Sequence, residues 1–436
     1  MFITNIKHLF ILISLIILMK TVCIEEDFKI PKEYISDQEF LIKALVTPDP
    51  VKILYASPDG KGNECTENNP SSLETAISKL QNGYTLYLKE GTYDVKKGIE
   101  ITEEGTSTSY ITISSAPGEN AIITSSLSTQ IGLFQIYGSY LIIENLNFKD
   151  VTAKNVQGIV FYGGGQNHVI IRNNNFDSLK TTKKGPNYGA NGILLMGEEA
   201  NPIKQVFIYG NILTNNILGY SEGISIAGNC EEIYVIKNTL KNNTNIGIDF
   251  YGNAGYCQTA SLDQPRKSVA TFNYISESIS PYADCAGLYI DGARDIFAGY
   301  NTIENSQYGI EIGSEERKDD YPVKNIILKE NTLNGNSVTG LRIGGYDEEE
   351  SGIVKDSSIE NNIITDSKTS VIIAKSDNIT FSENIISAEK YFIETDFDEN
   401  YIQNIKFVGN KFTGTGIFKM YGSKLTLDEF LKKYSS

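Results

Sequence analysis

An asparagine followed two residues later by a bulky apolar residue recurs along most of this chain. Successive copies lie 22 to 37 residues apart, and short apolar or alternating runs precede most of them. The copies begin at Asn174, Asn211, Asn238, Asn273, Asn301, Asn331, Asn362, Asn384 and Asn410. Short strands repeated with this period are typical of a solenoid, in which every coil stacks its side chains on those of the next coil.

The repeat predicts an all-β fold, namely a single-stranded right-handed parallel β-helix with three short sheets per coil and short helical caps. We expect the asparagines to stack from coil to coil and to satisfy backbone groups, and their tolerance of left-handed geometry suits the corner. The expected divisions are a cap with the first strands over 24–98, the β-helix over 99–418 and a C-terminal cap over 419–436. Within these caps, residues 24–50 are expected to cover the N-terminal end. Short helices are expected over Ser71–Leu80 and Thr426–Tyr434.

The first 23 residues read as a secretory signal peptide, because Lys7 and His8 precede an apolar run and Thr21 and Cys23 have the spacing of a cleavage site. Its removal takes away Lys7 and Lys20 and no acid, so the net charge of −16 becomes −18. We therefore expect an extracellular protein, monomeric and free of the membrane once the signal is removed. So acidic a surface disfavours nucleic acid and anionic membranes as partners, and it repels a polyuronate unless a cation bridges the two.

Four cysteines remain after the signal peptide, and an even count in a secreted protein permits two disulfides. The four are Cys65, Cys230, Cys257 and Cys285. Cys230 and Cys257 follow equivalent strands on neighbouring coils and are the favoured pair. Asn242 and Asn378 begin sequons that predict a glycoprotein if the host is eukaryotic.

A second repeated element is a glycine that opens an alternating strand. Its copies start at Gly158, Gly192, Gly223, Gly247, Gly287, Gly309 and Gly340, and the first and third residues after each glycine are apolar. With the two-residue period of a strand these side chains point into the core, so the second and fourth residues point outward. Outward acids appear on three consecutive coils, as Asp249, Asp291 and Glu311.

These three acids are the candidate catalytic residues. Neighbouring coils lie about 4.8 Å apart, so Asp291 is expected roughly 8 Å from each of the other two at the Cα atoms, and leaning side chains reach the range of glycosidase pairs. Like charges this close raise at least one pKa, which suits a general acid. The alternatives are that the acids only form surface ion pairs, or that they bind calcium.

Other residues are expected to fold over the same patch. Tyr251 and Tyr289 are placed to stack on a sugar, and Arg342 extends the acidic column by one coil. Asp263, Arg266, Asp284, Arg294 and Glu315 lie in flanking segments. The only histidine outside the signal peptide is His168, so a Ser-His-Asp or Cys-His mechanism has no convincing base, and zinc lacks ligands.

The N-terminal part resembles the opening of secreted polysaccharide lyases of the pectate-lyase-like superfamily. The resemblance is carried there by Tyr55-Ala-Ser-Pro-Asp-Gly60, the expected Leu73–Leu80 helix, Gly83-Tyr-Thr-Leu-Tyr-Leu88, Gly91-Thr-Tyr93 and Ala116-Pro-Gly118. The coil region resembles secreted β-helix proteins without a settled activity, through Gly247-Ile-Asp-Phe, Asp263-Gln-Pro-Arg266, Gly287-Leu-Tyr-Ile-Asp-Gly292 and Gly309-Ile-Glu-Ile. Together the resemblance covers about residues 52–415. The resemblance implies cleavage of acidic cell-wall polysaccharides, either by calcium-assisted β-elimination with an arginine or lysine base or by paired aspartates. The Asn-Thr-Asp signature of polygalacturonases is absent.

Three functions therefore stay open. In the first, a lyase uses Asp249, Asp291 and Glu311 to hold calcium, and Arg266 or Arg294 removes the proton next to a uronate carboxyl. In the second, an inverting glycoside hydrolase uses two of the carboxyl groups. In the third, the chain is a noncatalytic carbohydrate-binding or adhesin-like surface protein, which the irregular coils disfavour.

Overall fold

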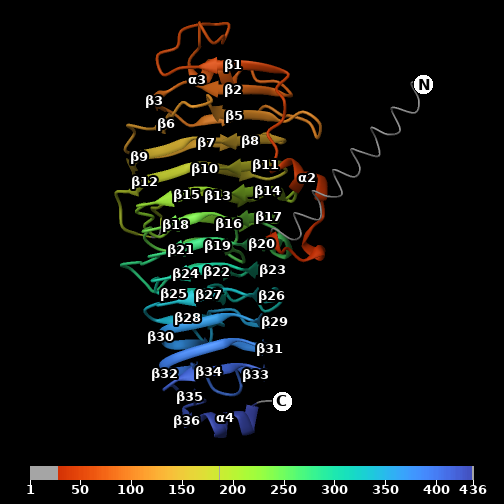
Figure 1. Ribbon diagram of the computed structural model, residues 1–436, viewed down its shortest axis with the longest axis vertical. Coiled ribbons are helices and arrows are strands. Elements are labelled where there is room, and N and C mark those ends of the chain that lie inside the picture. The colour runs from red at the N-terminus through yellow and green to blue at the C-terminus, as the bar shows by residue number, and fades with distance from the viewer. Residues whose placement is uncertain (1–27, 186, 435–436) are drawn as a thin grey trace, which may run out of the picture.

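The structure is a right-handed parallel β-helix, as the repeat predicts (Figure 1). This computed structural model describes residues 28–434 apart from Pro186, so the expected signal peptide lies outside the described residues. Three ladders of short parallel strands run the length of the molecule, and a continuous hydrophobic core fills the space between them. Among the described residues, no helix is both long enough and apolar enough to cross a membrane.

The first ladder is a sheet of thirteen parallel strands, which we call the strap sheet. Its strands are β1 (Lys52–Ala56), β2 (Tyr84–Leu88), β5 (Ile111–Ser115), β8 (Leu141–Glu144), β11 (Asn167–Arg172), β14 (Ile203–Tyr209), β17 (Cys230–Ile236), β20 (Arg266–Thr271), β23 (Arg294–Gly299), β26 (Val323–Lys329), β29 (Val354–Glu360), β31 (Ser376–Ser382) and β33 (Ile402–Val408).

The second ladder, which we call the glycine stack, contains the glycine-led strands. It consists of β4 (Ile99–Ile101), β7 (Gln130–Ile136), β10 (Asn155–Gly163), β13 (Ala190–Gly197), β16 (Ile224–Gly228), β19 (Ile248–Tyr251), β22 (Ala286–Asp291), β25 (Tyr308–Gly313), β28 (Thr339–Ile343), β30 (Ile363–Ile373), β32 (Ile385–Thr395), β35 (Ile417–Met420) and the antiparallel β36 (Ser423–Leu425). The third ladder contains β3 (Gly91–Asp94), β6 (Ala121–Thr124), β9 (Asn147–Ala153), β12 (Asn175–Thr181), β15 (Ile212–Thr214), β18 (Thr239–Lys241), β21 (Tyr274–Ser276), β24 (Thr302–Glu304), β27 (Thr332–Asn334) and β34 (Lys411–Gly414). The long strands β30 and β32 pair in both ladders.

The repeated asparagines form a continuous ladder of hydrogen bonds. Each one donates from its backbone N–H and its side-chain amide to the Oδ1 of the next, over 2.8–3.1 Å from Asn174 through Asn410. The amide also donates to a backbone carbonyl at the end of a strap-sheet strand, as Asn301 does to Ala270. The expected stacking is confirmed, but the left-handed conformation falls on the residue before each asparagine, such as Tyr300 with φ 57°.

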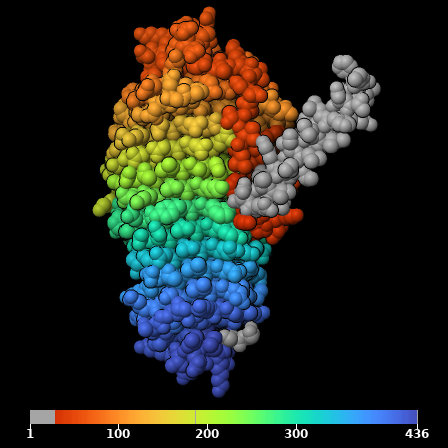
Figure 2. Space-filling view, viewed as in Figure 1, coloured from red at the N-terminus to blue at the C-terminus, as the bar shows by residue number. Residues whose placement is uncertain are grey.

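Residues 28–50 do not cover the N-terminal end of the helix, contrary to the expectation. They form a strap that runs along the outer face of the strap sheet and includes η1 (Lys32–Tyr34) and α2 (Gln38–Lys43) (Figures 1 and 2). Phe28, Phe40 and Leu41 pack there on outward-facing residues such as Phe207 and Tyr234. The strap is needed because one outward column of this sheet is apolar over seven consecutive coils, and unprotected apolar surface is unfavourable. This column is Ile142, Ile170, Phe207, Tyr234, Val269, Phe297 and Ile327.

The two ends of the core are closed by short helices. At the N-terminal end, α3 (Leu73–Ile77) buries Leu73, Ala76 and Ile77, and Ser72 caps it by accepting from the Thr75 backbone N–H. At the C-terminal end, α4 (Leu427–Tyr434) places Phe430 on Phe418 with ring centroids 3.8 Å apart. Both helices agree with the sequence expectation.

The four cysteines after the expected signal peptide are all buried and free, so the structure contains no disulfide among its described residues. The favoured Cys230–Cys257 pair is not formed. Instead the Cys230 thiol donates to the Ala227 carbonyl and the Cys257 thiol to the Glu199 carbonyl.

Candidate functional site

The strand register of the glycine stack confirms how the acids are arranged. Asp249, Tyr289, Glu311 and Arg342 pair in one outward column, on strands β19, β22, β25 and β28. Asp291 pairs with Tyr251 in the next outward column, two residues further along the strands. The inward residues between them, such as Ile290 and Ile312, belong to the hydrophobic core. The acids therefore share the outer face of three successive coils.

Insertions between the strands bury this outer face. Asp249 and Asp291 expose only 2% and 1% of their surfaces, and Glu311 exposes 7%. The insertion after β25 contributes Glu315, whose backbone N–H donates to Asp291 over 2.9 Å. The insertion after β19 contributes Tyr256, whose ring meets Tyr251 edge to face at 5.6 Å. The interrupted coils thus cover the acids, as insertions on a solenoid face tend to do.

A pocket of about 330 Å³ opens above the buried acids. Glu311, Glu315, Tyr289 and Arg342 are among the residues that line it. Tyr346, which is 56% exposed, stands at its rim. Asp249 and Asp291 are not among the lining residues, and nothing hydrogen-bonds to Asp249 Oδ1 among the described residues. The pocket wall therefore contains Glu311 and Glu315 but neither aspartate.

Glu311 is a buried acid that lines the pocket, and its side chain makes no close hydrogen bond to any described residue. Its Oε1 lies 3.6 Å from Arg342 Nε, too far for a good hydrogen bond, and no hydrogen bond is made by its side chain within the described part of the chain. Arg342 instead bonds Asp396 over 2.7 Å. Burial raises the pKa of Glu311 to about 8, while the Arg342 guanidinium opposes the shift and Glu315 adds to it.

The acids behind Glu311 also hold their protons more tightly than usual. Burial, followed by the charges of Asp291 and Glu222, holds the pKa of Asp249 well above its ordinary value. Burial, followed by the charge of Glu315, does the same to the pKa of Asp291. Because neighbouring carboxylates cannot all ionise in so little water, part of this cluster stays protonated at neutral pH.

Glu222 belongs to the cluster and was not expected from the sequence. Burial raises its pKa to about 7, and the Ser225 hydroxyl opposes the shift. It precedes Gly223, before β16 begins, so the strand alternation that located the other acids does not extend to it. The two-residue alternation of the strands therefore could not predict that Glu222 joins the other acids.

Three residues expected at the site do not contact the acidic cluster. They are Arg266, Arg294 and Asp263. Arg266 and Arg294 begin strands β20 and β23 of the strap sheet and form ion pairs with Glu231 and Asp295, at 2.9 Å and 2.5 Å. Within residues 28–434, neither guanidinium bonds to Asp249, Asp291 or Glu311. The Asp263 carboxylate accepts from the backbone N–H groups of Gly255 and Cys257, so it holds the insertion after β19 in shape.

Calcium was expected as a possible ligand of the three acids. The oxygen donors suit a hard cation, and the unpartnered Asp249 Oδ1 is available to one. However, no group of three or more carboxylates, histidines or cysteines converges closely enough to hold a metal ion within the described ranges. The described residues, as they are arranged, therefore do not fit a calcium ion.

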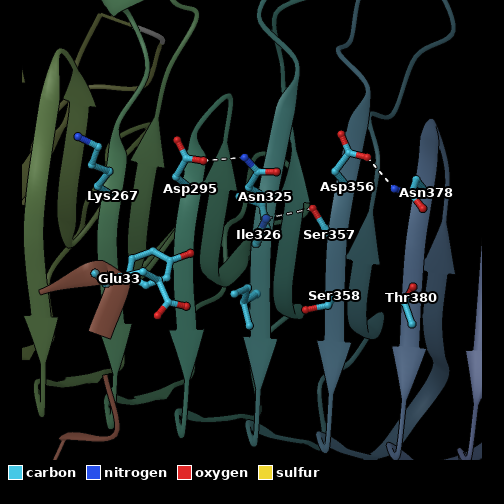
Figure 3. A pocket seen from close by; sticks show the side chains of 12 residues that line it. Glu33, Lys267, Asp295, Asn325, Ile326, Asp356, Ser357, Ser358, Asn378 and Thr380 are labelled. Carbon is cyan, nitrogen blue, oxygen red and sulfur yellow. Dashed lines mark hydrogen bonds between the residues drawn. The ribbon is translucent and has the colours of Figure 1, made fainter. Parts of the chain in front are cut away.

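A larger hollow of about 690 Å³ lies on the strap sheet (Figure 3), and neither Asp249, Asp291 nor Glu311 lines it. Its polar side chains bond one another, as Asn325 does to Asp295 and Asn378 to Asp356, both over 2.7 Å. Tyr34 of the strap closes one side. Side chains that already satisfy each other offer a ligand few free groups, so this hollow is not the candidate site.

The raised pKa values make a prediction about stability. Glu311 and Glu222 bind protons more tightly in the folded chain, so their contribution is complete below about pH 4.5 and is lost as the pH rises through about 7 to 8. The pKa of His168 is lowered, mainly by burial, so its contribution to stability is lost as the pH falls and is fully present above about pH 6.5, where it no longer changes with pH. The free energy of unfolding should therefore fall between pH 6.5 and 8, by up to about 1.4 kcal/mol per pH unit for each titrating acid.

Urea unfolding at half-unit pH steps measures this slope. Glu311→Gln should reduce it. Glu394→Gln is the matched control, because Glu394 lies further along the outward column that contains Arg342, is partly buried and pairs with Lys419 away from the pocket. A stability that is flat or rising over this range in the wild-type chain would contradict the raised pKa values.

Comparison with known proteins agrees with the fold. Residues 54–261 match a family model described as Pel9A-like, right handed beta helix region, and residues 286–429 match one described as right handed beta helix region. The chain is 30% identical over 373 residues to YwoF, an uncharacterized protein of Bacillus subtilis strain 168, across 80% of this chain and 77% of that protein.

Two solved structures show the same architecture at low identity. A GH136 lacto-N-biosidase from Eubacterium ramulus superposes with a TM-score of 0.55 at 12% identity, covering 84% of this chain and 68% of that one. The A-module of the mannuronan C-5 epimerase AlgE6 from Azotobacter vinelandii superposes with a TM-score of 0.50 at 12% identity, covering 78% and 94%. At this identity the likeness establishes the fold alone.

The fold and the match to the two models define a right-handed parallel β-helix protein with an acidic pocket on one outer face. The chain belongs to the pectate-lyase-like superfamily of such proteins and to the same family as YwoF.

Proposed function

We propose that this protein is a carbohydrate-active enzyme that cleaves glycosidic bonds at the pocket above Glu311. The observation that carries the proposal is that Glu311 is a buried carboxyl group, free of strong protein hydrogen bonds, which lines the pocket with a pKa raised to about 8. A carboxylic acid that keeps its proton at neutral pH is what a leaving glycosidic oxygen needs as a general acid. Two fold relatives whose names refer to glycan substrates support the substrate class.

In the hydrolytic route, Glu311 donates its proton to the glycosidic oxygen as the bond to the sugar carbon breaks. Glu315, the exposed acid on the same pocket wall, takes a proton from the water molecule whose oxygen bonds to that sugar carbon in place of the leaving oxygen. The negative charges of Glu315 and Asp284 help to hold the Glu311 proton in place, because each of them raises the pKa of Glu311. Asp249 and Asp291 are buried and do not line the pocket, so they are not assigned a step in this route.

β-Elimination is the second candidate, and the position of Arg342 favours it. This guanidinium lines the pocket beside Glu311, where it is able to face the carboxylate of a uronic acid. The expected bases Arg266 and Arg294 are paired elsewhere, so Arg342 is the cation of the pocket that a lyase would use.

The products distinguish the two routes. Purified protein is incubated with a panel of neutral and uronic-acid polysaccharides, with and without a chelator, and both reducing ends and ultraviolet absorbance are recorded. Hydrolysis gives reducing ends without new ultraviolet absorbance, and the chelator does not reduce the activity. Elimination gives reducing ends with the absorbance of unsaturated uronates. A panel that is bound but never cleaved would favour the carbohydrate-binding or adhesin-like alternative, and metal analysis of the purified protein tests the calcium expectation.

A further inference from the structure

An exposed pair of tyrosines stands beside the acidic pocket. The rings of Tyr220 and Tyr282 are stacked with centroids 4.8 Å apart and planes 12° from parallel. Tyr220 is 45% exposed, while Tyr282 is half-buried beneath it. The ammonium of Lys184, from another insertion, lies 5.9 Å from the Tyr282 ring. Large aromatic rings at the surface of a monomer, supported in a fixed orientation, are typical of recognition sites.

The pair is joined to the pocket through the backbone on both sides. Ala283 and Asp284, which follow Tyr282 directly, line the pocket, and Asp284 is held by the hydroxyl of Tyr308 over 3.1 Å. Tyr220 occupies a turn in which the Ser221 N–H donates to the Leu218 carbonyl. The Ser221 carbonyl accepts from the side chain of Asn245, whose neighbour Ile246 also lines the pocket. The rings are therefore fixed relative to Glu311.

We propose that the Tyr220–Tyr282 pair is a sugar-binding subsite that receives a pyranose ring of the same carbohydrate chain whose bond lies in the pocket. This inference rests on the proposed function. The pocket of about 330 Å³ is at the small end for ligand sites, so a longer chain has to leave it. The outer face of Tyr220 presents a flat apolar surface to the flat face of a sugar ring. Tyr282 supports that surface from below, and the ammonium of Lys184 lies over the Tyr282 ring.

The subsite predicts an effect on binding that depends on chain length. Tyr220→Ala should raise KM for long oligosaccharides about 3- to 10-fold, the range expected for loss of one aromatic contact, and change kcat less than twofold. For oligosaccharides too short to reach beyond the pocket, both constants should be unchanged. Tyr220→Phe should retain wild-type KM because the stacking face is kept.

Tyr137→Ala serves as the matched control, since Tyr137 is comparably exposed but follows β7, far from the pocket along the helix. Thermal melting of each variant excludes unfolding as the cause. If chains of every length are cleaved by Tyr220→Ala with wild-type KM, the subsite is wrong while the proposed function stands. If no carbohydrate is bound or cleaved by the wild-type chain, the proposed function fails and the subsite fails with it.

Discussion

Replacing Glu311 by glutamine should lower kcat by about 10²- to 10⁴-fold on any carbohydrate that the wild-type chain cleaves, the range expected for loss of a general acid. The amide keeps the shape of the side chain but has no acidic proton to give to the leaving oxygen. KM should change little, because the pocket wall stays in place. Initial rates over a range of substrate concentrations measure both constants.

The fold should tolerate this change. Arg342 keeps its bond to Asp396 when glutamine replaces Glu311, so no buried guanidinium is left without a partner. At pH 8 the variant should be at least as stable as the wild type, since it removes a group whose ionisation is disfavoured by burial. Glu394→Gln is again the control and should retain full activity. A Glu311→Gln variant that keeps more than a tenth of the wild-type kcat would exclude Glu311 as the proton donor.

Replacing Asn301 by alanine should lower the free energy of unfolding by about 3 to 6 kcal/mol. Asn301 Oδ1 accepts from the backbone N–H and the side-chain amide of Asn273, and its own amide donates to the Ala270 carbonyl. All of these groups are buried, and each one left without a partner costs about 1–3 kcal/mol. Urea unfolding monitored by far-ultraviolet circular dichroism measures the loss.

Thr302→Ala is the control for the ladder, since Thr302 is the next residue along the chain but half-exposed and outside the ladder. It should change stability by less than about 0.5 kcal/mol. A loss of under about 1 kcal/mol for Asn301→Ala would mean that water or a shifted turn replaces the missing bonds.

The features that repeat along the sequence were the ones that could be predicted from it. The asparagine spacing located the corner, and the period-two pattern placed Asp249 and Glu311 in one column with Tyr289 between them, as the register confirms. Both predictions work because parallel coils are stacked at a constant spacing, so position within one coil determines the neighbour in the next.

The apolar runs in the strands of the strap sheet indicate that a further segment covers its outer face. Runs of three apolar residues, such as Val169-Ile-Ile171, break the alternation expected of a strand with one solvated face. They indicate a strand that is buried on both faces. In the structure Val169 and Ile171 belong to the β-helix core, while Ile170 faces the strap. The apolar residues of 28–44 are its partners, but which segment covers the face depends on long-range packing.

Site features that depend on loops were beyond sequence reasoning. Glu222 precedes its strand, and Arg266 faces a different sheet from the acids although its segment is an insertion next to them. The expected Cys230–Cys257 disulfide is not formed, since the two thiols point to different backbone carbonyls and each donates a hydrogen bond there. Side-chain direction in an insertion is set by local turns such as the one that Asp263 holds, and no periodicity describes it.

The measurement that bears most directly on the acid cluster is a titration of its carboxyl groups by ¹³C NMR, with labelled aspartate and glutamate, between pH 5 and 9. Resonances removed by Asp249→Asn, Asp291→Asn and Glu311→Gln assign the three groups. We expect the Glu311 carboxyl to titrate near pH 8 and the two aspartates to stay protonated well above the ordinary aspartate range. If all three carboxyl groups are already ionised at pH 5, the pocket holds no proton donor and the proposed chemistry is wrong.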